Sequence, residues 1–300
     1  MNVLSLFDGM SCGRIALEKA GIQVDNYFSS EIKDYAIKVA DENYPQDKEN
    51  RLGDVTKING YDLPKIDLLI GGSPCQDFSG ANRERLGVDG SKSGLFFEYI
   101  RLLEETKPTY FLLENVRMKK EHQDFISEVI GCEPIVINSD KLSPQLRHRL
   151  YWTNIPNIEQ PEDKGLDIND FIDGYSDKKK ARALLESDSR PLSTPLKMAH
   201  RYLNKGFTTL IFKNEEHYNT IKEHFDTHFK KKLAKEIDVI SQGMDLSIYE
   251  GLRYMNNRER EYCQTVPQGY TDILSQNDAA CILGDGWTVD VIAHIFKNLK

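Results

Sequence analysis

The first half of the chain alternates short apolar runs with amphipathic stretches. The short runs are rich in β-branched and aromatic residues, as strands are, and the stretches between them place apolar residues at helical spacing. The alternation runs as NVLSLF then 14–20, NYFSS then 32–43, IDLLIG then 93–106, TYFLLE then 121–131, and PIVIN followed by RLYWTN. This pattern predicts βαβ units, and therefore a doubly wound α/β fold with a mostly parallel sheet and helices on both faces.

The loops that follow the predicted strands carry the unusual residues of the chain. Ligands of open parallel sheets bind at the carboxyl ends of the strands, which meet at one edge. We therefore expect one rim of the sheet to gather the loops at 8–13, 31, 54, 71–80 and 114–117.

Between about 156 and 250 this rhythm is lost, and the sequence becomes Pro-punctuated and rich in Lys and His. The change predicts a separate lobe at 156–250, with 1–155 and 251–300 forming the main domain. Residues 176–235 hold 14 Lys/Arg against 7 Asp/Glu, although the whole chain has a net charge of -8. A single run such as 178–180 is usually a solvated face, but clustering in one segment also suits a surface that faces phosphate groups.

Composition excludes several classes of protein. With 39% hydrophobic residues in 300, the chain can bury a sizeable core, which argues against a disordered protein. It has no basic leader and no apolar run of about 18 residues, so we expect a cytoplasmic protein without a membrane span. The five cysteines include no CxxC pair, which argues against a zinc site or a disulfide framework and leaves at least one thiol free to react.

Three loops together suggest a site for an adenosine. The segment 7–13, FDGMSCG, follows the first strand, and its glycines let backbone amides approach a ligand, although a tight turn explains them equally well. Glu31 at the tip of the second strand can accept hydrogen bonds from ribose hydroxyls, and Asp54 can accept one from an adenine amino group. Each acid can equally be a helix cap. The GxGxxG fingerprint of nicotinamide and flavin enzymes is absent.

The segment 71–76, GGSPCQ, sets Cys75 in a glycine and proline loop directly after a buried-looking strand. A lone cysteine is usually a small buried hydrophobe, but a position in a loop favours display. Because the thiolate is the strongest side-chain nucleophile, Cys75 is the candidate nucleophile. The segment 77–93, with three glycines and two arginines, suits a lid that contacts a phosphate backbone.

Two further polar positions fall on the same predicted rim. Glu114 follows the apolar TYFLL run, and a carboxyl group partly buried there can keep a proton to donate. In QLRHR, an extended strand projects Gln145, Arg147 and Arg149 to one side, which makes Arg149 a candidate to hold a carbonyl oxygen. The competing interpretation of Glu114 is a surface acid, and that of the QLRHR segment is a strand whose charged side chains form salt bridges.

In their order these segments resemble the motifs of the cytosine-5 DNA methyltransferase family over nearly the whole chain. The matching segments are FDGMSCG, SE, GDV, GGSPCQDFS, SGLFFEY, ENV and QLRHR. Any one of them is weak evidence, whereas seven in the family's order are specific. Several look like the animal de novo branch, but the absence of a regulatory domain looks like a bacterial or bacteriophage enzyme. The resemblance implies S-adenosylmethionine as methyl donor, S-adenosylhomocysteine as product and double-stranded DNA as partner, with no metal.

The resemblance also implies a mechanism. Cys75 attacks carbon 6 of a flipped-out cytosine, Glu114 protonates or hydrogen-bonds N3, and Arg149 holds the O2 region. Carbon 5 then takes the methyl group, and loss of its proton releases Cys75. The base must leave the stack because attack comes from above its plane. Further residues implied at the reacting centre are Gln76, Asn115, which braces the loop of Cys75, and Arg147.

The donor site implied by the resemblance spans the ends of several strands. Glu31 lies on the ribose, Ile32 against the adenine and Asp54 at the adenine amino group. The full set is Phe7, Asp8, Gly9, Gly13, Glu31, Ile32, Asp54, Val55, Leu95, Asp285 and Trp287. The segment GDGW at 284–287 resembles the last motif of the family, where many members carry Asn in place of Asp285. The extra carboxylate can alter donor affinity.

Three other functions stay open. One branch of the family methylates tRNA and typically has Cys-Phe-Thr in its recognition lobe, where the nearest text of this chain is the GFT of 206–208. A second is a catalytically silent DNA-binding relative, although the cysteine, both acids and the arginine are kept. A third is a generic nucleotide-binding α/β protein. The lobe at 156–250 varies most within the family, so the motifs give neither the target sequence nor a role such as restriction-modification, and a monomer is the default.

Overall fold

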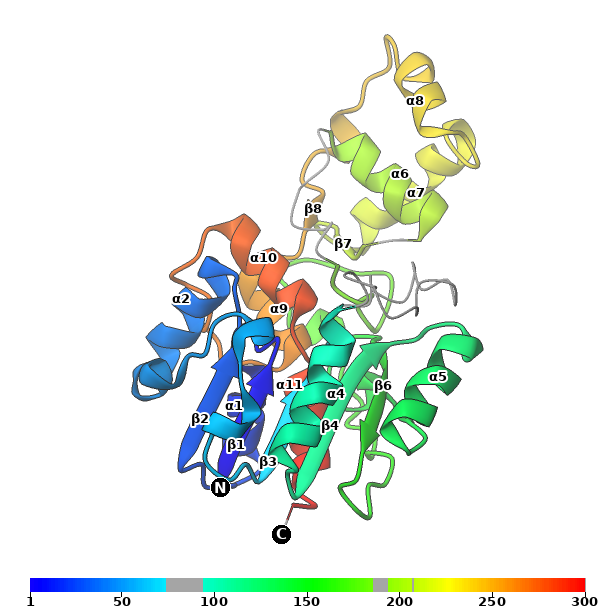
Figure 1. Cartoon of the computed structure of the whole chain (residues 1–300). Helices are drawn as coiled ribbons and strands as arrows, with labels where there is room; N and C mark the ends of the chain where they lie inside the picture. The colour runs from blue at the N-terminus through cyan, green and yellow to red at the C-terminus, as the bar shows by residue number, and fades with distance from the viewer. Residues whose placement is uncertain (74–93, 186–193, 207, 300) are drawn as a thin grey trace. The chain divides into compact units, whose positions relative to one another are not determined.

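The chain folds around a six-stranded sheet, as the alternating pattern predicts (Figure 1). The computed structural model describes residues 1–73, 94–185, 194–206 and 208–299. The strands are β1 (Asn2–Leu6), β2 (Asn26–Ser30), β3 (Leu68–Gly71), β4 (Tyr110–Val116), β5 (Ile135–Asn138) and β6 (His148–Thr153). Across the sheet they follow the order β2-β1-β3-β4-β6-β5.

One strand of this sheet runs against the others. β1 pairs in parallel with β2 and β3, and β3 with β4, whereas β6 is antiparallel to both β4 and β5. The connection 139–147 is shorter than the dozen or so residues that a parallel crossover needs, so the chain returns as an antiparallel neighbour. The carboxyl ends of β1 to β4 therefore share one edge with the amino end of β6.

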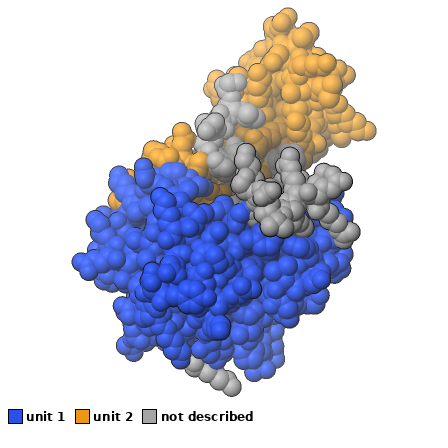
Figure 2. Space-filling model, in the orientation of Figure 1, with its two compact units in different colours: residues 1–138, 148–161, 287–300 blue, residues 139–147, 162–286 orange. Residues whose placement is uncertain are grey.

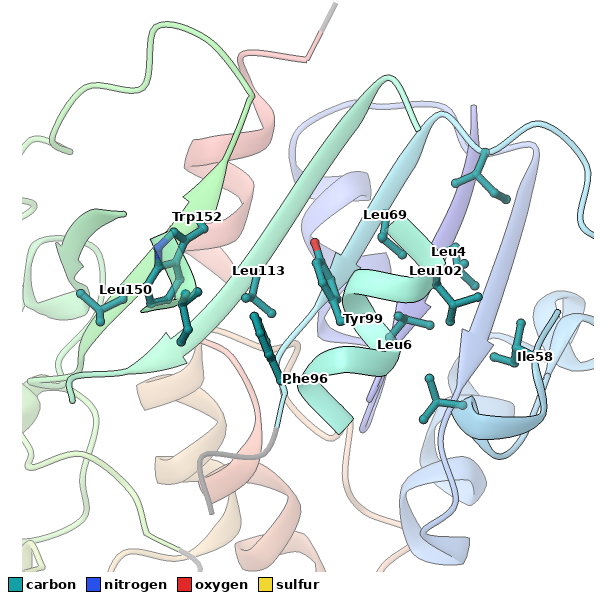
Figure 3. Packing of buried hydrophobic residues seen from close by; sticks show 13 residues of the cluster. Leu4, Leu6, Ile58, Leu69, Phe96, Tyr99, Leu102, Leu113, Leu150 and Trp152 are labelled. Carbon is teal, nitrogen blue, oxygen red and sulfur yellow. The ribbon is translucent and has the colours of Figure 1, made fainter. Parts of the chain in front are cut away.

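Helices cover both faces of the sheet. They are α1 (Cys12–Lys19), α2 (Asp34–Asn43), α4 (Gly94–Thr106), α5 (Lys120–Ile130) and α11 (Val289–Phe296). α4 sets Phe96, Tyr99 and Leu102 at helical spacing, and all three are fully or almost fully buried against the sheet. Figure 3 shows them beside Leu69 and Leu113, so the apolar stripe of α4 seals one face of β3 and β4.

The opposite face is covered by α1. Successive strand residues point to opposite faces, so Ile70 points away from the cluster that contains Leu69. A Cβ added at Gly13 of α1 would lie 2.3 Å from Ile70 Cδ1, so α1 packs this closely only because residue 13 is glycine. α1 also packs against α11, and Lys19 forms a 2.7 Å ion pair with Asp290.

The described residues group into two compact units, coloured separately in Figure 2. Unit 1 comprises 1–138, 148–161 and 287–300 and contains the six-stranded sheet, and unit 2 comprises 139–147 and 162–286. The division predicted from sequence placed 139–147 and all of 251–300 with the sheet. The target-recognition role given to 156–250 stays a prediction.

Unit 2 has a core of its own. Its elements are α6 (Pro195–Lys205), β7 (Leu210–Ile211), α7 (Glu215–His228), α8 (Ala234–Ile240), β8 (Arg253–Tyr254), α9 (Asn257–Gln264) and α10 (Gln276–Asp285). Buried side chains of α6, α7 and α8 form one apolar cluster, among them Leu196, Phe225 and Ile237, and Phe229 joins it directly after α7. α9 packs on α10.

Polar contacts explain why 139–147 and 251–286 belong to unit 2. The fully buried Gln145 donates to the carbonyl of Cys263 at 3.0 Å and to Oε1 of Gln264 at 3.2 Å. Arg147 donates to the carbonyls of Gly284 at 3.0 Å and Gly286 at 2.8 Å. Buried polar groups keep their partners because an unpaired one costs about 1–3 kcal/mol. Sequence periodicity does not reveal such a network, so the boundaries of unit 2 in the structure differ from those predicted for the second lobe.

One window of the chain is apolar enough in composition to span a membrane, Gln276–Phe296, with a mean hydropathy of 1.3. It consists of α10 and α11, and 67% of it is buried inside the protein. Burial of this extent is typical of core helices.

Candidate functional site

The loop after β1 has a tightly wound backbone. Phe7, Gly9 and Ser11 all adopt left-handed φ angles, of 57°, 58° and 61°. For Phe7 and Ser11 this conformation is strained, and strain of this kind persists only where the surroundings hold it. Such residues gather at ligand sites, in keeping with the predicted role of this loop.

The Asp8 carboxylate supports this loop from inside. It accepts hydrogen bonds of 2.6 Å each from the hydroxyls of Ser5, Ser11 and Tyr27, and Arg51 lies 3.4 Å away. Burial raises the pKa of Asp8, while the three hydroxyls and Arg51 act in the opposite direction. The predicted donor contact therefore does not extend to the Asp8 side chain, which points into the protein. Two of these partners, Tyr27 and Arg51, lie 19 and 43 residues away in the sequence, so the motif does not reveal them.

Glu31 links the ends of β1 and β2. Its Oε2 accepts a hydrogen bond from the backbone N–H of Gly9 at 2.8 Å, and its Oε1 accepts from those of Ile32 at 2.8 Å and Lys33 at 2.9 Å. A carboxylate offers about four lone-pair sites, so one on Oε2 is left for a ribose hydroxyl. The Ile32 side chain beside it is 70% exposed, which suits a flat ring, although single exposed apolar residues are common.

Asp54 lies beyond α2, directly before a short 3-10 helix at Val55–Lys57. Its Oδ1 accepts hydrogen bonds from the backbone N–H of Thr56 at 3.0 Å and from the Thr56 hydroxyl at 2.9 Å. These bonds, led by the backbone one, hold the pKa of Asp54 below its usual value. The side chain is thus a cap, as the alternative interpretation has it. The carboxylate is also ionised at neutral pH, so its unused lone pairs can accept a hydrogen bond from an amino group.

Four other residues of the predicted donor site serve packing. Val55 is buried in the cluster under α4, Leu95 and Phe7 are partly buried against the same cluster, and Gly13 allows α1 to approach the sheet. Of these, Leu95 and Phe7 keep exposed surface for a ligand. Val55 and Gly13 can act on a donor only by shaping the loops.

A second group of polar residues lies at the carboxyl end of β4. Glu114 is buried there, and the register sets Arg149 of β6 opposite Val116. Arg149 Nε lies 2.9 Å from Glu114 Oε1, and Trp287 Nε1 donates to Glu114 Oε2 at 3.0 Å. One carboxylate oxygen is therefore paired with a cation, and the other accepts a hydrogen bond from a neutral donor.

Asn115, the next residue of β4, holds the end of the segment that leads to Cys75. Its Nδ2 donates to the carbonyl of Ser73 at 3.2 Å and to the Ser73 hydroxyl at 3.3 Å, and both residues are buried. Ser73 is followed directly by Pro74 and Cys75. Asn115 thus bonds the backbone two residues before Cys75, in keeping with its predicted bracing role. Cys75, Gln76 and the predicted lid at 77–93 lie outside the described residues.

The strand predicted for 145–149 is shorter in the structure. β6 begins at His148, and Gln145 forms only an isolated bridge with Ala181. Gln145 and Arg147 are instead buried in unit 2, where the Arg147 guanidinium bonds the carbonyls of Leu184, Gly284 and Gly286. The prediction that 145, 147 and 149 share one face of a strand is therefore wrong, and Arg147 acts on backbone carbonyls. Asp285 is exposed at the end of α10.

The four described cysteines are all free thiols. Cys12 and Cys263 are buried, and Cys132 and Cys281 are partly exposed. Burial raises the pKa of Cys132, and raises that of Cys263 to about 12. Since the thiolate is the reactive form, neither of these two is suited to be a nucleophile at neutral pH.

Cys263 is expected to resist alkylation in the folded protein. With a pKa of about 12, roughly one thiol in ten thousand is ionised at about pH 8, and the sulfur is fully buried. Peptide mapping after brief iodoacetamide treatment should find Cys263 unmodified in buffer and modified in concentrated urea. Equal modification in both conditions would contradict the burial of this thiol.

Comparison with known sequences places the chain among DNA methylases. The family model described as C-5 cytosine-specific DNA methylase matches residues 1–300. The orphan methyltransferase M.SPRI of Bacillus phage SPR is 31% identical over 277 residues, which cover 83% of this chain and 61% of that protein. An orphan methyltransferase of Bacillus phage rho11s is 43% identical over 164 residues, which cover 50% of this chain and 32% of the relative. The matched regions thus span about a third to three fifths of these relatives.

Solved structures share the fold over the full length. The Entamoeba histolytica methyltransferase EhMeth matches with a TM-score of 0.70 and 18% identity, covering 100% of this chain and 99% of the other. A putative DNA modification methyltransferase encoded within an E. coli prophage matches with a TM-score of 0.61 and 20% identity, covering 100% and 98%. At this identity the likeness shows the fold alone. From the family match over all of its residues, the chain belongs to the C-5 cytosine-specific DNA methylase family.

Proposed function

We propose that the protein transfers a methyl group from S-adenosylmethionine to carbon 5 of cytosine in DNA. The observation that carries the proposal is the arrangement at the end of β4. There Glu114 is held by Arg149 and Trp287, while Asn115 holds Ser73, two residues before Cys75. Covalent attack on a cytosine ring needs a carboxylate held in one orientation and a cysteine whose loop starts from a fixed position.

The chemistry follows from these side chains. The Cys75 thiolate adds to carbon 6 of the base, and the electrons that this displaces make carbon 5 nucleophilic. Glu114 bonds or protonates N3 during this step, and Arg149 bonds the O2 region, so the charge that develops on the ring is stabilised where it forms. Carbon 5 then accepts the methyl group and loses its proton, and the bond from Cys75 to carbon 6 breaks to restore the aromatic ring.

Residues at the ends of β1 and β2 fit the proposed donor. Glu31 has a lone pair left on Oε2, Asp54 is an ionised acceptor, and Ile32 offers an exposed apolar surface. Two acceptors beside an apolar surface match a ribose and an adenine with its amino group. When bound, the donor supplies the electrophilic methyl group.

DNA is the proposed substrate because the family is named for it and because unit 2 includes the basic segment 176–235. Extrusion of the cytosine costs a few kcal/mol, which contacts to the phosphate backbone have to offset. We assign target recognition to unit 2 on this charge alone.

A transfer assay with labelled S-adenosylmethionine tests the proposal. The purified protein should label duplex DNA that contains cytosine, and should not label the same duplex with every cytosine methylated at carbon 5. Label on tRNA and none on DNA would replace DNA by tRNA as the substrate. No label on either, with no binding of the donor in the presence of DNA, would favour the generic nucleotide-binding alternative.

Gly72→Ala is expected to lower kcat about tenfold while leaving thermal stability nearly unchanged. A Cβ there would lie 3.0 Å from Trp287 Nε1 and 3.1 Å from Glu114 Oε2, so both side chains have to move by a few tenths of an ångström. Small displacements of positioned groups cost rate more than stability. Single-turnover rates and a melting curve measure the two effects.

The matched control for this substitution is Gly94→Ala. A Cβ at Gly94 meets nothing within 4 Å, so the variant adds the same methyl group without displacing a neighbour. An equal loss of kcat in both variants would contradict the close contact at Gly72.

A further inference from the structure

We propose that Trp287 is a positioning residue of the reaction, whose indole N–H fixes the plane of the Glu114 carboxylate toward the base. The inference rests on the proposed function and deepens it. An indole has a single donor, and Trp287 uses it on Glu114 Oε2 at 3.0 Å. With Arg149 Nε 2.9 Å from Oε1, both oxygens are held, and the carboxylate cannot turn about its terminal bond without breaking one contact.

The end of β3 is shaped for this contact. A Cβ at Gly72 would approach Trp287 Nε1 to 3.0 Å, Trp287 Cε2 to 3.5 Å and Glu114 Oε2 to 3.1 Å. The backbone of Gly72 therefore lies directly against the bonded pair. Three segments far apart in sequence, at 72, 114 and 287, meet within a few ångströms in unit 1.

The backbone that leads into Trp287 is also held. The carbonyl of Gly286 accepts hydrogen bonds from Arg147 at 2.8 Å and from Gln264 at 3.1 Å. On the other side of Trp287, the chain enters α11 through the buried Thr288 and Val289. The backbone is thus hydrogen-bonded directly before Trp287 and buried directly after it.

The two partners of the Glu114 carboxylate differ in charge, which sets the oxygen that meets the base. Oε1 is paired with the Arg149 cation, whereas Oε2 accepts from a neutral N–H and keeps more of its negative charge for the base. Oε2 also keeps a lone pair beyond the one that the indole uses, and that lone pair meets N3 when the base binds. Trp287 therefore holds the carboxylate both before the base arrives and during the reaction.

Trp287→Phe removes the donor and keeps an aromatic ring. We expect kcat to fall about ten- to a hundredfold, as for loss of a hydrogen bond to a charged group, while the Kd for S-adenosylmethionine and the KM for DNA change by less than about threefold. Trp287→His, which can place a ring N–H on the same side, should recover part of the loss.

The matched control is the other tryptophan of the chain. Trp152 donates to the Ser127 hydroxyl at the same 3.0 Å, and its ring packs in the apolar core of unit 1 and makes no bond to Glu114. Trp152→Phe therefore deletes an equivalent bond, and it should lower the melting temperature without the loss of kcat. An equal loss in both variants, or a loss of donor affinity with an unchanged kcat for Trp287→Phe, would overturn the proposal.

A second measurement does not need a Trp287 variant to fold. The chain has two tryptophans, so the native protein should give two indole N–H resonances. In Glu114→Gln, the resonance of Trp287 should shift while that of Trp152 stays in place, and if neither moves, the positioning role is wrong. This measurement needs no turnover, so it tests the role of Trp287 even in a protein that methylates neither DNA nor tRNA. Such a lack of methylation would overturn the proposed function and not the contact between Trp287 and Glu114.

Discussion

Cys75→Ala is expected to lower methyl transfer to DNA by at least about ten-thousandfold, since losing the nucleophile leaves no route to activate carbon 5. Binding should persist, because the proposed donor contacts come from Glu31, Ile32 and Asp54. Cys75 itself lies outside the described residues, and the prediction rests on the GGSPCQ loop together with the hold of Asn115 on Ser73. Single-turnover assays with labelled donor, beside titrations of donor and DNA, separate the rate from the binding.

Cys281→Ala provides the control for this substitution. Cys281 is a partly exposed free thiol of α10, so its removal tests whether any accessible cysteine matters. Its rate should equal that of the native protein. If Cys75→Ala retained more than about a tenth of the native rate, covalent attack by this thiol would be excluded.

Glu114→Gln is expected to lower kcat about a hundred- to a thousandfold, with a smaller change in the melting temperature. Glutamine keeps the shape, but it has no charge to pair with Arg149. Its amide nitrogen would also have to face a donor at either Arg149 or Trp287, since a donor holds each oxygen of the carboxylate. The variant therefore loses both the orientation of the group and its ability to transfer a proton to N3.

Glu105→Gln is the matched control for the loss of a paired carboxylate. Glu105 of α4 pairs with Arg101 at 2.9 Å and accepts a hydrogen bond from the backbone N–H of Gly60, all within unit 1. Its substitution should affect stability and leave kcat within about twofold of the native value. Similar kcat losses for the two variants would mean that Glu114 is structural.

The sheet and the loops at its edge could be predicted from the sequence, because the spacing of apolar residues and the residue types of turns depend on neighbouring positions only. The run TYFLLE is a strand that ends near Glu114, and LLIGG ends directly before the cysteine loop, as the alternation indicates. The positions of Glu31, directly after β2, and of Asp54, between α2 and β3, follow from the same pattern.

What could not be predicted are contacts that close over long separations. Trp287 and Glu114 are 173 residues apart, and no pattern links an indole in the last motif to a carboxylate in the fourth strand. The inward turn of Asp8 is another case, because the motif is the same whether the side chain points to a ligand or to Tyr27. The two glycines before Ser73 were a usable signal, since glycine at a strand end often marks a close approach.

The start of β6 was also predicted wrongly, because a short extended segment can be held by partners outside the sheet. The QLRHR segment reads as extended, but Gln145 and Arg147 find buried partners in unit 2, at Gln264 and Gly286, that compete with pairing in the sheet. Burial of an arginine against carbonyls overrides a local preference for strand. The same contacts moved the boundary of unit 2.

Trapping with DNA that contains 5-fluorocytosine tests the central claim most directly. Fluorine cannot leave carbon 5 as the proton does, so the bond between Cys75 and carbon 6 should persist once the methyl group is transferred. Peptide mass mapping should then find the nucleotide adduct on the peptide that contains Cys75, in the presence of S-adenosylmethionine and not in Cys75→Ala. Methylation of cytosine in ordinary DNA without any adduct on Cys75 in the fluorinated duplex would contradict the account.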